Sequence, residues 1–481
     1  MEHWLMKRAN LSPNDLAIET MEEQWTFKQL YKKALSFAEK IAFLKGKHVA
    51  ILSDNSLDII VAFWGCTLLE TKIIFLNTKL SERELIQQCE TADVDAIIGQ
   101  SIFLQQLESF TCPIYSYKEI EALSPAGKVE ISTDINLNSI CSMMFTSGTT
   151  GAAKAVTQTY DNHWSSAIAS SLNLGLESRD KWLICLPIFH ISGLSTVIKS
   201  VIYGMPIFLM SSFDAVKINQ VIETRGVTHI SVVSTTCQRL IENLGDKRYP
   251  TTFRCMLLGG GPAPKPLLEK AAQKDIPIIQ TYGMTETCSQ ISTLSMKDAL
   301  QKIGSAGKAL FTASLEIRQG DKKLSAHQIG EIVVKGPMVT QGYYQADSAN
   351  MESFRSEWFY TGDMGYVDDD GFLYVVDRRS DLIISGGENI YPAEIEEVLL
   401  SLDGIKEAGV TGIEDEEWGQ VPIAFLVTEK SWTENELKVY CEENLARYKI
   451  PRKFYFCDSL PRNATNKLQR HLLKTKLNDF K

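Results

Sequence analysis

The chain has 481 residues, of which 44% are hydrophobic and 22% charged, and its formal net charge at pH 7 is −10. This composition indicates a globular protein with a large core in more than one domain, and it excludes a fibrous or disordered chain. The acidic balance argues against a nucleic-acid partner, and no apolar stretch reaches the ~20 residues of a membrane span, so we expect neither partner and a cytoplasmic location.

Short apolar runs recur through the first 380 residues, with longer amphipathic stretches between many of them. The runs lie at residues 48–54, 72–77, 182–188, 206–210, 229–234, 255–260 and 277–283. This alternation predicts an α/β fold with parallel-rich sheets flanked by helices. Loops at the carboxyl ends of such strands are the usual ligand sites of α/β proteins.

The pattern changes after about residue 380. It predicts helices at 392–401 and 433–448, and strands at 407–413, 422–428 and 453–457. This order favours a small α+β domain. We therefore expect a large N-terminal domain at 1–379 and a small C-terminal domain at 380–481, joined by a short hinge near Ser380.

The cysteines stand singly along the chain, and none forms a Cys-x-x-Cys pair. Many lie inside apolar runs, such as Cys185 in the run at 182–187. In a chain of this size the pattern predicts buried, reduced thiols rather than a disulfide framework or structural zinc.

The most specific local signal is the segment 146–154, Thr-Ser-Gly-Thr-Thr-Gly-Ala-Ala-Lys, which follows an apolar run. Backbone N–H groups of a Gly-rich turn, hydroxyls and an ammonium group are what a triphosphate needs, because its charge is spread over several oxygens. The spacing is not that of a Walker A loop. The alternative is a flexible surface turn. The candidate phosphate-binding residues are Thr146, Ser147, Gly148, Thr149, Thr150, Gly151 and Lys154.

The chain resembles the adenylate-forming superfamily, which includes acyl-CoA synthetases, luciferases and peptide-synthetase adenylation domains. The matching motifs run almost end to end in the family order: the phosphate loop, residues 259–264, 282–286 and 360–363, Arg378, residues 386–389, and residues 463–467. The resemblance implies ligation of a carboxylic acid to coenzyme A through an acyl-adenylate, with ATP, Mg²⁺ and coenzyme A bound. Ala153 stands where the family usually has Pro, which loosens the loop without removing a ligand group.

Residue chemistry agrees with the roles that the resemblance implies. Tyr282 can stack on adenine, and the Asp363 carboxylate can accept hydrogen bonds from both ribose hydroxyls. Thr285 offers a hydroxyl to the α-phosphate, and Glu286 is a hard oxygen ligand for Mg²⁺. A core aromatic, a helix cap or a solvated charge is the alternative for each. The other candidate nucleotide- and coenzyme-binding residues are Gly260, Gly261, Pro262, Gly283, Arg378, Gly386, Gly387 and Glu388.

Lys467 lies near the C-terminus, far in sequence from the phosphate loop, so only docking of the small domain can bring it to the nucleotide. The resemblance implies that it clamps the reacting phosphate in the first half-reaction. It also implies that the small domain is mobile, rotating so that the 386–391 loop faces a coenzyme A channel in the second. A solvated terminal lysine is the alternative.

Three residues are candidates for contact with the acid. The resemblance places His190 beside the reacting carboxylate, and a structural histidine with satisfied hydrogen bonds is the alternative. If a helix begins near Ser192, Lys199 lies two turns later on roughly the same face, and a cation there suits an acid with a second carboxylate. A solvated lysine on the helix surface is the alternative. The motif wording also resembles the branch of the superfamily that ligates 2-succinylbenzoate, an aromatic keto acid with two carboxylates, in menaquinone biosynthesis.

Other functions stay open at this point. A ligase for another aryl or medium-chain acid would differ only in pocket residues. A peptide-synthetase adenylation domain is disfavoured, because 14 residues follow Lys467. A non-catalytic acyl-adenylate sensor is opposed by the retained Lys154, Glu286, Asp363 and Lys467. The sequence leaves open whether the chain forms a homo-oligomer.

Overall fold

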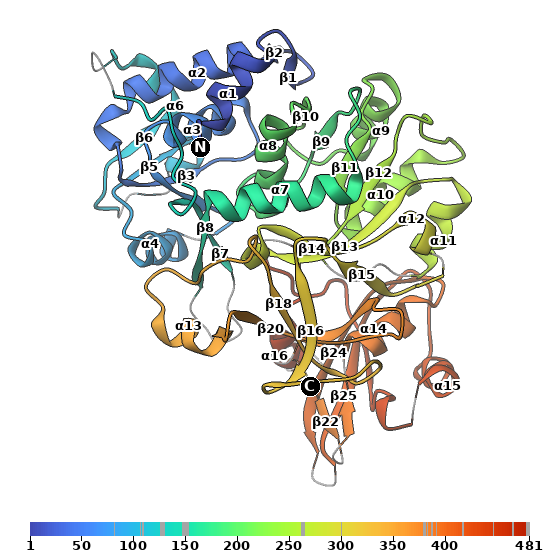
Figure 1. The fold of residues 1–481 in the computed structure, drawn as a ribbon. Helices are drawn as coiled ribbons and strands as arrows, with labels where there is room; N and C mark the ends of the chain where they lie inside the picture. The colour runs from blue at the N-terminus through green and yellow to red at the C-terminus, as the bar shows by residue number, and fades with distance from the viewer. Residues whose placement is uncertain are drawn as a thin grey trace.

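A computed structural model gives the fold of the chain (Figure 1). It describes residues 1–80, 82–105, 107, 110–125, 130–146, 153–260, 265–299, 301–378, 381, 383–385, 388–390, 392–415, 418–445, 447–463 and 466–477.

The first sheet ends in the hairpin that carries the phosphate loop. In the described residues its strand order is β6-β5-β3-β4-β7-β8, and all neighbours are parallel except β7 and β8. Its strands are β3 (His48–Leu52), β4 (Lys72–Leu76), β5 (Ala96–Gly99), β6 (Ile114–Ser116), β7 (Ile140–Thr146) and β8 (Lys154–Thr159). Strand β3 is buried along its whole length, which is typical of a central strand in a parallel sheet.

The second sheet holds the parallel strands that precede and follow the residues predicted to contact the acid. Its parallel part runs β13-β12-β11-β9-β10-β1, with β2 antiparallel at the edge. The bounds are β1 (Leu16–Glu19), β2 (Gln24–Thr26), β9 (Trp182–Ile184), β10 (Ile207–Leu209), β11 (His229–Val232), β12 (Cys255–Leu258) and β13 (Ile278–Met284). The structure confirms the α/β class and each apolar run as a strand.

The same sheet continues into antiparallel strands that the apolar runs did not predict. They are β14 (Ser289–Leu294), β15 (Ser305–Ala309), β16 (Ser314–Gln319), β17 (Lys322–Lys323), β18 (Gly330–Lys335), β19 (Phe354–Arg355), β20 (Trp358–Val367) and β21 (Leu373–Arg378). Several are only partly buried: β16 mixes buried, half-buried and exposed positions, and β20 mixes buried and half-buried ones. They therefore lack the continuous apolar runs on which the sequence analysis relied.

Helices cover these sheets, and local signals fix several of their ends. In α2 and α7, the N-terminal threonine and the third residue of the helix bond reciprocally, which satisfies otherwise orphaned N–H groups. The helices of this part are α1 (Trp4–Leu11), α2 (Phe27–Lys40), α3 (Leu57–Thr67), α4 (Glu82–Thr91), α5 (Ser101–Leu104), α6 (Tyr117–Ala122), α7 (Tyr160–Leu174), α8 (Ile191–Tyr203), α9 (Ala215–Thr224), α10 (Ser234–Leu244), α11 (Lys265–Gln273), α12 (Met296–Ala299) and α13 (Asp347–Ser353). Helix α7 crosses the middle of the molecule (Figure 1).

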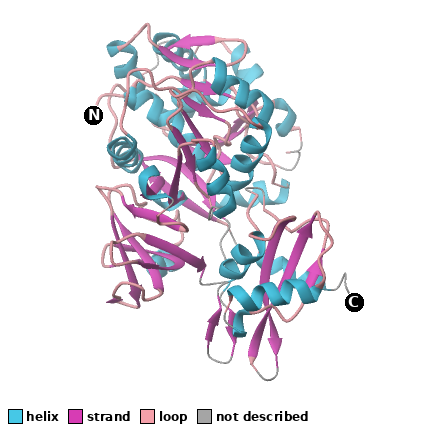
Figure 2. Cartoon of the chain, turned by 90° about the vertical axis from the view of Figure 1, so that its right-hand side faces the viewer, coloured by secondary structure: helices cyan, strands magenta, loops and turns pink. Residues whose placement is uncertain are grey.

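A small C-terminal unit has its own sheet and core. Its strands are β22 (Ile383–Ser385), β23 (Glu388–Ile390), β24 (Ile405–Asp415), β25 (Gly419–Thr428) and β26 (Phe454–Phe456), and its helices are α14 (Pro392–Leu400), α15 (Glu434–Asn444) and α16 (Arg470–Lys476). Figure 2 shows it beside the antiparallel strand cluster, below the helix-rich body. Helix α15 ends at Asn444, four residues earlier than predicted, because Leu445 turns to an extended conformation.

The predicted domain boundary at 379/380 lies outside the described residues, and it stays a prediction. It falls between β21, the last strand of the large sheet, and β22, the first strand of the small one. Asp381, directly beyond it, pairs with Arg470 of α16 at 2.8 Å. Asp381 is therefore tied to the small unit.

The cysteines are all free thiols, which agrees with the sequence analysis. Eight are buried, and Cys112 and Cys457 are half-buried. None of the helices in the described part of the chain has the length and apolar character that crossing a membrane requires.

Candidate active site

The phosphate loop connects two paired strands. Thr146, at the end of β7, lies opposite Lys154, at the start of β8, in an antiparallel pair. The predicted phosphate ligands Ser147, Gly148, Thr149, Thr150 and Gly151 lie outside the described residues. Lys154 is half-buried, and its Nζ stands 5.2 Å from the centre of the Tyr343 ring.

Tyr343 joins the phosphate lysine to the predicted metal ligand. Its hydroxyl donates to Oε1 of Glu286 at 3.1 Å, and Glu286 is itself buried. Burial, and next the Glu286 charge, raises the pKa of the Tyr343 phenol, so the phenol stays a hydrogen-bond donor. Tyr343 therefore contacts both the Lys154 ammonium, through its ring, and the Glu286 carboxylate, through its hydroxyl.

The backbone of the Thr285–Glu286 turn is held from two sides. The Gln158 amide donates to the Thr285 carbonyl at 2.9 Å, and the Thr340 N–H donates to the Glu286 carbonyl at 2.7 Å. Ser142 in turn donates to the Gln158 side chain at 2.7 Å. These contacts fix the turn before any ligand arrives, which is the preorganisation that charge stabilisation needs.

Sequence reasoning missed Gln158, Thr340 and Tyr343. Gln158 and Tyr343 contact the 285–286 turn across 127 and 57 residues, respectively. No local spacing marks such pairs, because they meet only when β8 packs against the segment 340–344. The isolated pairing of Val156 with Tyr343 makes that contact.

The two residues predicted to bind adenosine contact each other. The Tyr282 hydroxyl donates to Oδ2 of Asp363 at 2.9 Å. Asp363 lies opposite Arg378 in the β20–β21 ladder, and its N–H donates to the Thr361 hydroxyl at 3.1 Å. The structure therefore brings an aromatic ring and a buried carboxylate together at one position.

At two of the glycines predicted to line the nucleotide site, the local backbone itself requires glycine. Gly260 has φ +80°, a conformation that L-residues rarely adopt. A Cβ on Gly283 would lie 1.9 Å from the Ser289 carbonyl oxygen, so the β13–β14 pairing requires that glycine. Gly261, Pro262, Gly386 and Gly387 lie outside the described residues, and Arg378 and Glu388 are placed only by their strand positions.

His190 precedes α8 and is neutral. It occupies the N-cap position without capping through its side chain. Its Nε2 is buried and has no hydrogen-bond partner in the described part of the chain. Burial, with the Lys79 charge second, lowers the pKa of the imidazole to about 4. A ligand that reached this nitrogen would supply the missing partner.

Lys199 is a buried cation. Only 2% of its surface is exposed, and its Nζ stands 5.5 Å from the centre of the Trp182 ring. Within the described residues the ammonium has no carboxylate or hydrogen-bond partner. Burial lowers its pKa to about 8. Cations are rarely buried without a counter-ion, because desolvation is costly.

The helix predicted near Ser192 begins at Ile191, and the structure buries Lys199 on it while leaving Ser192 half-buried. Two turns of helix, about 10 Å, separate the two residues. No described contact joins their side chains, so a shared pocket for Ser192 and Lys199 stays a prediction. Trp182 is the first residue of β9, so Lys199 lies near the amino end of that strand.

Lys467 lies where Arg462 and Asn463 pair with residues 466–468, and we call these five residues the lysine hairpin. The Asn463 N–H donates to the Lys467 carbonyl at 2.9 Å, and the Lys467 N–H donates to the Asn463 side chain at 2.8 Å. Beside Lys467, the Asn466 amide donates to the Thr235 hydroxyl of α10 at 3.3 Å. The small unit is therefore docked on the large one through the segment that carries Lys467.

The donor set fits a magnesium ion bound together with a nucleotide. No group of three or more His, Cys, Asp or Glu side chains gathers as a metal site among the described residues. Mg²⁺ is often held by one or two carboxylates plus substrate phosphates and water. The buried Glu286, linked to Lys154 through Tyr343, matches that requirement better than a self-contained protein cage.

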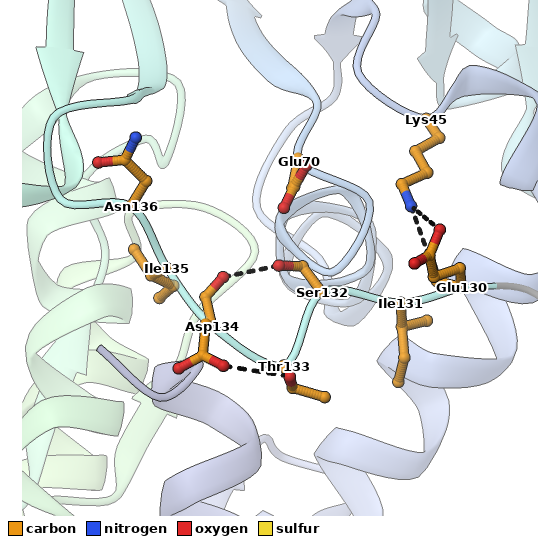
Figure 3. A pocket seen from close by; sticks show the side chains of 9 residues that line it. All are labelled: Lys45, Glu70, Glu130, Ile131, Ser132, Thr133, Asp134, Ile135 and Asn136. Carbon is orange, nitrogen blue, oxygen red and sulfur yellow. Dashed lines mark hydrogen bonds and ion pairs between the residues drawn. The ribbon is translucent and has the colours of Figure 1, made fainter.

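A hollow of about 450 Å³ lies elsewhere, around the segment 130–136 (Figure 3). Its wall includes the carboxylates of Glu70, Glu130 and Asp134, and Lys45 pairs with Glu130 at 3.1 Å. Such a wall repels a triphosphate or a carboxylic acid. None of the predicted site residues that the structure describes lines it, so we assign it no part in catalysis.

Known proteins are similar to this chain in sequence and in fold. The model of the AMP-binding enzyme family matches residues 5–344, and that of the AMP-binding enzyme C-terminal domain matches residues 394–467. A 2-succinylbenzoate–CoA ligase of Oceanobacillus iheyensis is 52% identical over 98% of both chains. The o-succinylbenzoate CoA synthetase of Bacillus subtilis, in complex with the acyl-adenylate intermediate OSB-AMP, is 46% identical over 98% of both chains, with a TM-score of 0.95.

The same Bacillus subtilis enzyme in complex with ATP and a magnesium ion also gives a TM-score of 0.95, over 98% of this chain and 99% of that one. A value this high over nearly the whole chain means that both domains are arranged as in those complexes. The predicted resemblance to the adenylate-forming superfamily is confirmed, and the chain belongs to the family of AMP-binding enzymes.

Proposed function

We propose that this chain ligates 2-succinylbenzoate to coenzyme A through an acyl-adenylate, giving 2-succinylbenzoyl-CoA, AMP and pyrophosphate, in menaquinone biosynthesis. Relatives that match it over almost their whole length carry this activity in their names. The observation that carries the substrate assignment is the buried Lys199, whose ammonium has no counter-ion among the described residues. An acid with a second carboxylate would supply that counter-ion.

In the first half-reaction, a carboxylate oxygen of the acid bonds to the α-phosphorus of ATP, the bond to the β-phosphate breaks, and pyrophosphate leaves. The chain contributes mainly alignment and charge neutralisation. Lys154 faces the phosphates from the hairpin, and Lys467 approaches from the docked small domain. Glu286, with phosphate oxygens, would hold Mg²⁺, which supplies further positive charge. Tyr282 and Asp363 would orient the adenosine.

In the second half-reaction, the coenzyme A sulfur bonds to the acyl carbonyl carbon, AMP leaves with the electron pair of the broken C–O bond, and the thiol loses its proton. The lysine hairpin must withdraw to let the thiol approach. We propose that the small domain rotates about residues near 380, and that Gly386, Gly387 and Glu388 then face the coenzyme.

His190 and Lys199 lie at different heights along helix α8 and offer partners for the two carboxylates of a dicarboxylic acid. His190, at the start of the helix, would contact the reacting carboxylate as a neutral donor or acceptor. Lys199, whose backbone lies about 13 Å further along the axis, would pair with the other carboxylate. A monocarboxylic acid would leave the Lys199 charge buried and unpaired, so the pocket discriminates against it. Ser192 lies between these positions.

The test is AMP release from purified protein that depends on ATP, Mg²⁺ and coenzyme A, measured across a panel of acids. We expect 2-succinylbenzoate to give a kcat/KM at least about tenfold above benzoate and octanoate, since one satisfied buried charge is worth about 1.4 kcal/mol or more. Succinate has two carboxylates but a much shorter chain, and we expect it to be a poorer substrate because it is too short to reach both His190 and Lys199. Mass spectrometry identifies the thioester. A preference for a monocarboxylic acid would refute the substrate assignment.

We propose that the chain works in the cytoplasm. All ten cysteines are free, and eight of them are buried, which supports a reducing compartment and the proposed cytoplasmic location.

A further inference from the structure

Asn466 connects the lysine hairpin to the large domain. Its backbone is left-handed, with φ 62°, which asparagine tolerates better than most residues. Its side-chain amide donates to the Thr235 hydroxyl at 3.3 Å, across 231 residues of sequence. The next residue is Lys467, so this contact lies directly beside the proposed catalytic lysine.

The lysine hairpin is bound to the rest of the small domain, so the Asn466–Thr235 contact also restrains that domain. Arg462 pairs with Glu407 of β24 at 2.6 Å, and its Nη1 also donates to the Asn466 carbonyl at 2.8 Å. Arg462 and Leu468 pair across the hairpin. Asn466 and Lys467 therefore belong to one hydrogen-bonded turn, and we expect the position of Lys467 to depend on the position of Asn466.

The acceptor lies at the edge of the sheet where the ligands are proposed to bind. Thr235 is the second residue of α10, which starts two residues after β11 ends. That end of β11 adjoins the ends of β12 and β13, and Tyr282 lies on β13. The contact therefore holds the small domain at the carboxyl edge of the parallel strands, where a lysine can reach a bound nucleotide.

We propose that Asn466 is a positioning residue, a latch between the domains that favours the arrangement for the first half-reaction. The proposal rests on the two-step function proposed above. The Asn466–Thr235 bond is present when Lys467 is docked and must break when the small domain rotates. A single, exposed, neutral hydrogen bond such as this one shifts such an equilibrium about two- to fivefold. The latch is therefore strong enough to bias docking and weak enough to release.

Two substitutions remove the bond from opposite sides. Asn466→Gly deletes the amide and keeps the left-handed turn, because glycine adopts a positive φ readily. Thr235→Val deletes the hydroxyl at nearly constant volume. Ser356→Gly is the matched control: it removes an exposed side chain at another left-handed position, with φ 47°, in the turn between β19 and β20. Circular dichroism and melting curves confirm that each variant folds.

The two half-reactions are measured separately, by ATP–pyrophosphate exchange and by thioester formation from supplied acyl-adenylate. We expect each single variant to lower exchange about two- to fivefold and to leave thioester formation unchanged or faster, while the double variant loses no more than either single one. The control should match the wild type in both assays.

Equal losses in both half-reactions, additive effects in the double variant, or an unchanged exchange rate would each overturn the latch. Both assays use the acid that gives the wild type its highest exchange rate. An error in the substrate assignment therefore appears in the acid panel, and an error about the latch appears only in the variants.

Discussion

Replacing Lys199 by methionine should make the protein more stable and less able to use its acid. Burial lowers the pKa of this lysine from 10.5 to about 8. The unfolded chain therefore binds the proton more tightly than the folded one, and folding with the charge costs roughly 3 kcal/mol. The cost is full below pH 8 and disappears as the pH rises to about 10.5.

Methionine fills the same space without a charge. The loss of the contact with Trp182 offsets roughly 0.5–2 kcal/mol, so a net gain of about 1–3 kcal/mol remains at pH 7. Urea unfolding at pH 7 and pH 10 measures it, and the difference between variant and wild type should shrink at the higher pH. The same variant should lose about 2 kcal/mol of affinity for the second carboxylate, roughly 30-fold in kcat/KM for 2-succinylbenzoate.

Lys181→Met is the matched control on the same edge of the sheet. Lys181 pairs with the buried Glu19 at 2.7 Å and donates to the Arg225 carbonyl at 2.7 Å, so its loss should destabilise the protein. A higher free energy of unfolding for Lys199→Met and a lower one for Lys181→Met would show that the Lys199 charge destabilises the fold, as expected of a residue that serves ligand binding. A Lys199→Met protein that gains no stability, or loses benzoate activity as strongly as 2-succinylbenzoate activity, would refute the reasoning.

Three further outcomes are expected. Lys467→Ala should strongly lower pyrophosphate exchange while sparing thioester formation from supplied acyl-adenylate, because the lysine acts on the reacting phosphate only in the first half-reaction; equal loss of both steps would contradict this. Tyr343→Phe should lower the exchange rate about tenfold and raise the Mg²⁺ concentration it needs, because the Glu286 carboxylate loses a donor; an unchanged Mg²⁺ titration would speak against it. His190→Ala should lower kcat/KM by a factor that is constant from pH 5.5 to 8, because the pKa of the imidazole is about 4; a ratio with a midpoint near 6.5 would show that the imidazole titrates in the working range.

The sequence determined the class of fold and the kind of reaction by itself. Each apolar run forms a strand of a largely parallel sheet, because a strand that is buried on both faces needs apolar side chains along its whole length. Ordered motifs identified the family, since short Gly-rich and charged signatures depend on local backbone chemistry. The antiparallel strands between residues 289 and 378 were not predicted, because partly buried strands lack a continuous apolar run.

Only the tertiary structure decided which distant groups meet. The Tyr343 contact with Glu286 and the Asn466 contact with Thr235 each depend on how separate elements pack, and no spacing along the chain encodes them. The same holds for Lys199: its place on a helix was predictable, but its burial against Trp182 was not. Helical periodicity gives the face of a side chain, whereas the neighbours across that face, and hence its charge state, are set by the packing of the whole domain.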